Sequence, residues 1–136
     1  MRCYDFVGAI LISMVTIVSC SKPKQQVAPP APTMPAGWSV TSDANIPAAQ
    51  LPRIAETLGG NIVALRNTVY DVKGKRIQLN ILVAADAANA DAIMTSFKDI
   101  KPDEFLLRKD LIIYEFVGKD DAIPDMNAGK AHIQEL

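Results

Sequence analysis

Cysteine and histidine are scarce in this chain of 136 residues. The two cysteines are Cys3 and Cys20, and the single histidine is His132. A metal site needs several Cys, His or acidic ligands that converge on one point, so the sequence predicts no metal site and a solvated His132. No cysteine follows Cys20, so no disulfide is expected in the folded part, and the core alone must hold it together.

Familiar catalytic motifs are absent as well. The chain has no G-x-S-x-G elbow, no G-x-x-x-x-G-K-[ST] loop and no G-x-G-x-x-G fingerprint. The neighbouring carboxylates Asp103-Glu104 and Asp120-Asp121 could serve acid–base catalysis only in a cleft that alters their pKa values. Both pairs stand in turn-like sequence, which favours solvated turns. The sequence therefore predicts no catalytic residue and no cofactor, with an unfamiliar acid–base enzyme as the alternative.

A long hydrophobic run is missing too. The apolar stretch from Val7 to Val18 is well short of the roughly 20 residues that cross a bilayer as a helix. Arg2 precedes the stretch, and small or β-branched residues end it. A charged start, a short apolar middle and a small-residue end are typical of a secretory signal.

The end of this signal is more specific. Ile17-Val18-Ser19-Cys20 resembles the lipobox of bacterial lipoprotein precursors. The resemblance implies diacylglycerol transfer to the Cys20 sulfur, cleavage before Cys20 and acylation of the new amino terminus, for example with palmitate. Ser21 favours the outer membrane, facing the periplasm, by the same analogy. The alternative is an ordinary signal peptide or membrane anchor in which the cysteine is incidental. We expect residues 1–19 to be a signal peptide of an exported, lipid-anchored protein.

Residues 20–37 predict a linker behind the lipidated cysteine. Five prolines fall between Ser21 and Gly37. Such segments favour extended polyproline II at about 3.1 Å per residue, which makes a semi-rigid spacer of up to ~50 Å. The PxxP spacing of Pro29 and Pro32 also matches ligands of SH3-like grooves. The composition favours the spacer.

The periodicity after Gly37 predicts one small domain over 38–118 and a polar tail over 119–136. Its elements alternate between helix and strands, which favours an α+β two-layer sandwich, with an antiparallel sheet and both helices on one face. Either a ferredoxin-like plait or a duplicated αββ unit fits this order; the latter aligns Leu65–Val72 with Leu107–Phe116. The expected elements are strands at 38–42, 61–72, 77–83 and 105–117 (two strands), and helices at 51–58 and 90–100.

Basic residues gather around the expected hairpin turn at Lys73-Gly74. We predict a binding face formed by Lys73, Lys75, Arg76 and Arg108. Such a patch could meet anionic lipid headgroups, lipopolysaccharide or an acidic protein, while the alternative is a solvated, charged turn. The domain leans acidic, so nucleic acid is not an expected partner.

These observations favour a binding module over an enzyme. A tether and a small domain without a catalytic constellation are typical of an envelope protein that docks another envelope protein or a cell-wall polymer. The alternatives are an envelope enzyme and a structural component of an envelope complex.

The lipobox makes a direct prediction. Cys20→Ala should block processing and leave an uncleaved precursor, because the substituted side chain has no sulfur to accept diacylglycerol. Metabolic labelling with palmitate should mark the normal protein alone. Equal labelling of both proteins would contradict the lipoprotein hypothesis.

Overall fold

The computed structural model describes residues 27–100 and 105–136. The predicted signal peptide, Cys20 and the Asp103-Glu104 pair lie outside these residues. The elements are β1 (Trp38–Asn45), η1 (Ala48–Gln50), α1 (Leu51–Leu58), β2 (Ile62–Val72), β3 (Lys75–Ala84), α2 (Ala87–Ile100), β4 (Leu106–Lys109), β5 (Ile112–Gly118), η3 (Asp120–Ala122) and α3 (Ile123–Glu135). No described helix has the length and apolar character needed to cross a membrane.

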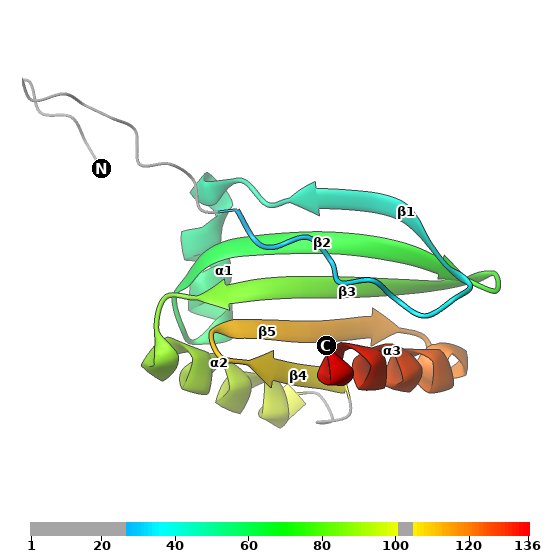
Figure 1. Cartoon of the computed structure of the whole chain (residues 1–136). Coiled ribbons are helices and arrows are strands. Elements are labelled where there is room, and N and C mark those ends of the chain that lie inside the picture. The colour runs from blue at the N-terminus through cyan, green and yellow to red at the C-terminus, as the bar shows by residue number, and fades with distance from the viewer. Residues whose placement is uncertain (1–26, 101–104) are drawn as a thin grey trace, which may run out of the picture.

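The strands form one antiparallel sheet in the order β1-β2-β3-β5-β4 (Figure 1). This confirms the predicted α+β fold. Local sequence determines where two helices begin and end. Gly59 ends α1 in the left-handed conformation, and the Asp86 carboxylate accepts a hydrogen bond from the Asn89 backbone at the start of α2.

Alternation along β3 explains why the sheet is covered on both faces. Leu82 and Ala84 pack with Ile93 and Phe97 of α2 and Leu51 of α1, so these two helices share one face, as predicted. The alternate residues of β3 point to the opposite face of the sheet, which side chains of α3 cover. That second cluster includes Ile77, Leu79, Ile81, Met126 and Ile133.

The C-terminal segment 119–136 is therefore not a polar tail. It forms η3 and α3, and Ala122, Met126 and Ile133 are buried in the second cluster. Only a narrow stripe of α3 is apolar, which is why the segment reads as polar in sequence. The folded unit extends beyond the expected 38–118 boundary at this end.

The unit also extends beyond the expected boundary at its start. Residues 27–37, expected to belong to a free spacer, run along the sheet on the α3 side (Figure 1). Ala28 is buried, and Ala31 and Met34 pack against the second cluster. Small and flexible side chains can therefore pack even in a proline-rich stretch.

The strand order separates the two expected topologies. In a ferredoxin-like plait each helix connects two parallel strands. Here α1 connects β1 to β2, which pair directly and antiparallel. Two α-β-β units are present, and β2-β3 and β5-β4 are arranged symmetrically about the β3·β5 pairing. The proposed alignment does not follow this symmetry, because Leu65–Val72 lies on one strand whereas Leu107–Phe116 spans a hairpin.

The burial of α3 predicts a stability effect. Ile133→Ala should lower the free energy of unfolding by about 2–5 kcal/mol, because it removes methyl groups from a fully buried site. Denaturant titration measures the loss. Gln134→Ala on the exposed side of the same helix should stay within about 0.5 kcal/mol. Equal effects of the two changes would argue against docking of α3.

Candidate functional site

Three of the four predicted cations meet at the β2–β3 turn. Lys73 and Gly74 both have positive φ, 54° and 80°, as a two-residue hairpin turn of type I′ requires. The Asp71 carboxylate accepts a hydrogen bond from the Gly74 backbone at 2.8 Å and supports the turn. Lys75 and Arg76 follow at the start of β3, so this end of the sheet carries a compact group of charged side chains.

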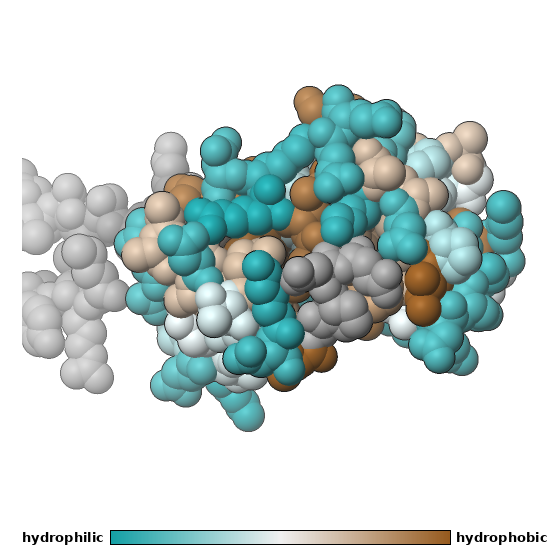
Figure 2. All heavy atoms as spheres, turned by 90° about the horizontal axis from the view of Figure 1, so that it is seen from below, coloured by the Kyte–Doolittle hydropathy of each residue, from teal (hydrophilic) through white to brown (hydrophobic). Residues whose placement is uncertain are grey.

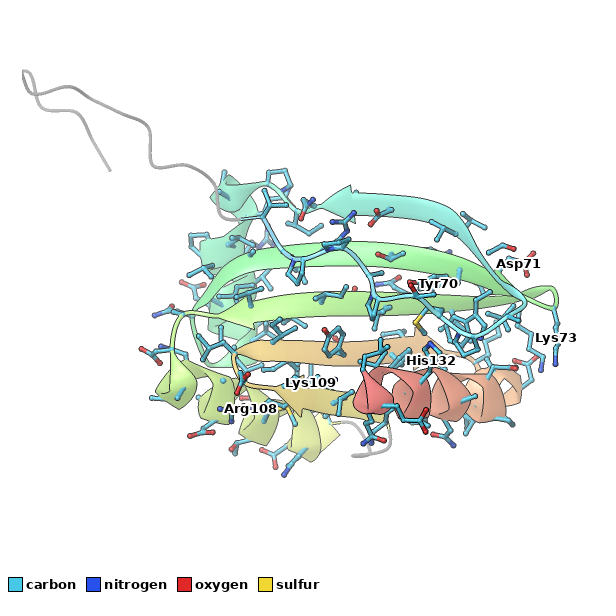
Figure 3. The ribbon with its side chains drawn as sticks, in the orientation of Figure 1. Tyr70, Asp71, Lys73, Arg108, Lys109 and His132 are labelled. Carbon is cyan, nitrogen blue, oxygen red and sulfur yellow. The ribbon has the colours of Figure 1, made fainter. Side chains whose placement is uncertain are left out.

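Arg108 does not join this group. It lies on β4 at the other end of the sheet from Lys73, as Figure 3 shows. Its guanidinium forms an ion pair with Asp91 of α2 and donates a hydrogen bond to the Asp110 carbonyl at 2.9 Å. These contacts tie β4 to the helix layer, which is a structural role.

Lys75 also has a partner. Its ammonium lies 3.2 Å from the Asp125 carboxylate and donates to the Asp121 carbonyl at 2.8 Å. These bonds fasten the hairpin to the beginning of α3. Within the described residues, Lys73 and Arg76 make no ion pair or side-chain hydrogen bond. The acids Asp71, Asp121 and Asp125 offset much of the local positive charge, so the hairpin end is not a strongly basic patch.

Two grooves flank the hairpin. One has a volume of about 390 Å³ and is bounded by Ser42, Val69 and Asp71. The other has a volume of about 600 Å³ and is bounded by Gln78, Val117 and Lys119. Arg76 and Lys75 line both. Because Lys75 is held by α3, Arg76 is the available cation that the two grooves share, and Lys119 is a second cation in the larger groove.

A row of polar side chains crosses the middle of the sheet, on the face to which Arg76 belongs. Asn67, Asn80 and Glu115 occupy matching positions on β2, β3 and β5. Asn67 donates to the Asn80 carbonyl oxygen at 2.7 Å, Gln78 donates to the same oxygen at 3.1 Å, and Asn80 donates to Glu115 at 3.3 Å. We call these four residues the amide row. The bonds hold the half-buried side chains in fixed orientations, and Gln78 reaches into the larger groove.

The amide row was not predicted. Gln78 and Asn80 were recognised as the polar side of a strand, but their neighbours Asn67 and Glu115 come from other strands. Only the pairing register brings them together. The alternation of polar residues along three strands was the available signal.

A second polar group fastens β1 to β2 on the opposite face. Arg66 binds the Asp43 carboxylate through two nitrogens, and the Thr68 hydroxyl donates to it at 3.0 Å. The Arg66 hydrogen bond holds the pKa of Asp43 below its ordinary value. Burial raises the pKa of the neighbouring Tyr70 phenol to about 12, so Tyr70 stays neutral. Arg66, Asp43 and Thr68 join the two strands and line neither groove, whereas Tyr70 borders the smaller groove.

The remaining titratable residues of the described chain are dispersed. His132 is half-buried on α3, and Asp120-Asp121 lies in exposed η3. Among residues 27–100 and 105–136, no group of three or more His, Cys, Asp or Glu side chains could hold a metal ion.

Comparison with known proteins gives no relative. No family model matches the chain, and neither curated proteins nor solved structures contain a significant match. The geometry of the hairpin end is therefore the basis for assigning a function.

The Asp43–Arg66 pair predicts a pH dependence of stability. The folded pKa of Asp43 is lowered, so its contribution is complete above about pH 5 and is lost as the pH falls through the folded pKa. Asp43→Asn should therefore be less stable than the normal protein at neutral pH, by about 1 kcal/mol or less. The difference should shrink in acid.

Urea unfolding of both proteins across this pH range measures the difference. Asp99→Asn, an exposed change on α2, serves as the control. A difference between Asp43→Asn and the normal protein that is constant with pH would show that the pair contributes nothing through its charge.

Proposed function

We propose that this chain is an exported envelope protein, anchored by lipid at Cys20, whose domain binds a cell-wall polymer without catalysing a reaction. The single observation that supports this binding is the position of Arg76. Arg76 lines both grooves and stands two residues before Gln78 of the amide row on β3, without an ion-pair partner in the described part of the chain. Charge-assisted hydrogen bonds from such a group suit a carboxylate.

The amide row favours a polar, polymeric ligand. Amide and carboxylate groups fixed by mutual hydrogen bonds can bond sugar hydroxyls and peptide amides without reordering, which lowers the entropic cost of binding. A cell-wall polymer combines hydroxyl, amide and carboxylate groups. Each of these has a matching partner among Arg76, Gln78, Asn80 and Glu115.

The surface favours this partner over a protein. Protein interfaces concentrate aromatic and other apolar anchors at their centre. The face seen from the side of α2 and α3 is mainly hydrophilic, with small separate hydrophobic areas (Figure 2). The exposed large hydrophobic residues of the described chain are scattered along it: Val27, Val40, Ile100, Val117 and Leu136.

Arg76→Glu tests the proposal. The variant should bind purified cell-wall polymer about tenfold or more weakly, because a hydrogen bond to a charged group contributes about 1.5–3 kcal/mol. Co-sedimentation of the membrane-extracted protein with the insoluble polymer gives the affinity. Stability should change by no more than about 0.5 kcal/mol, since Arg76 is exposed.

Lys98→Glu on the exposed face of α2 is the matched control, because it makes the same change of charge away from the grooves. Equal binding by the two variants would show that Arg76 is not part of the binding site. If the normal protein does not sediment with the polymer, the choice of partner is wrong.

A further inference from the structure

Exposed side chains recur at every third position within residues 27–36. Val27, Pro30, Thr33 and Ala36 are exposed, whereas Ala28, Ala31 and Met34 turn toward the protein. A polyproline II helix has three residues per turn, so one row of its side chains faces a surface on which it lies. The exposure pattern is that of a polyproline helix lying on the sheet, and we call this segment the strap.

The strap is held at its sheet-facing positions. Ala31 and Met34 pack against the cluster beneath α3, and about 310 Å³ of space remains between the strap and the β1–β2 surface. Met34 and Trp38 both approach Gly129 of α3 closely. A Cβ atom at Gly129 would lie 2.9 Å from Met34 Cε and 2.8 Å from Trp38 Cη2. The glycine thus permits strap, sheet and helix to meet.

The aromatic surroundings of the strap match those that bind polyproline. Trp38 stands edge-on to Tyr70, with ring centroids 5.2 Å apart. Aromatic grooves bind Pro-rich segments because a polyproline helix is already extended and loses little entropy. The occupant here is the chain's own segment, so the PxxP spacing serves a contact within the domain.

The strap also has a direction. It begins beside α1, runs along the sheet toward the β2–β3 turn, and reverses at Gly37 to enter β1 (Figure 1). Gly37 has a φ of 93°, and Trp38 pairs with Val72 next to the turn. Ten residues of polyproline helix span about 30 Å. The start of the strap and the Arg76 grooves therefore lie at opposite ends of the sheet.

We infer that the strap sets the orientation of the domain on its membrane, with the α1 end toward the bilayer and the hairpin end away from it. This inference rests on the proposed anchor at Cys20. With the strap docked, only residues 21–26 separate that anchor from the domain, a reach of about 20 Å. A free linker from 21 to 37 would allow ~50 Å and any orientation.

The docking can be tested without a membrane. Trp38 is the only tryptophan of the chain, so its emission reports on the strap. Ala31→Arg should shift this emission to longer wavelength and open the segment to protease, whereas Thr33→Arg, on the exposed row, should change neither. Met34→Ala serves as a milder change if Ala31→Arg prevents folding. Equal emission and cleavage in all variants would overturn docking.

The orientation is tested with the full chain, processed by the cell and reconstituted in vesicles that carry nitroxide-labelled headgroups. A dye at Arg53→Cys on α1 should be quenched several-fold more strongly than a dye at Lys73→Cys. In the Ala31→Arg background the two should become similar. Equal quenching with an intact strap overturns the inferred orientation. Failure of the protein to float with vesicles overturns the anchor and the orientation with it, while the Trp38 result still decides docking.

Discussion

Burial of both faces of β3 is the constraint on which the rest of the structure depends. Ile77, Leu79 and Ile81 point to one side of the sheet, and Leu82 and Ala84 point to the other. A single helical layer cannot cover both sets, so the chain must supply two. Because α1 and α2 already occupy one face, the other face requires α3 and the strap. The chain segments on both sides of the expected domain are thus part of its core, which follows from the sequence of a single strand.

The local part of the fold could be predicted from sequence. Alternation identified the strand at Ile77–Val83, and the Lys73-Gly74 turn was correct because a turn depends on neighbouring residues. Asp43 and Asn45 are residues that favour a turn, yet β1 continues to Asn45. Asp43 forms an ion pair with Arg66, which lies 23 positions away, and this pair keeps Asp43 in the strand. A long-range contact here overrides the turn preference of a single residue.

The difference between local and long-range contacts also explains which predictions held at the candidate site. Lys73, Lys75 and Arg76 were correctly grouped because a hairpin turn keeps them together. Arg108 was grouped with them from its place on an expected strand, but the register pairs it with Ile113, opposite Leu82, and so places it at the other end of the sheet. The amide row needs the register of three strands, which no local pattern contains. Charge alone was also a poor guide, because Lys75 is bound by Asp125. Only the geometry shows that Arg76 is the available cation that lines both grooves.

The two ends of the sheet differ in how the helices cover them. At one end α1 and α2 pack over Ile62, Leu82 and Ile113, so that end is apolar and closed on the helix face. Next to it, toward the hairpin, the same face carries Gln78, Asn80 and Glu115, which are linked by hydrogen bonds. The Lys75 contacts with α3 then hold the hairpin rigid from the opposite side. The strap packs on the opposite face, against the cluster beneath α3, so the strap does not cover this polar row.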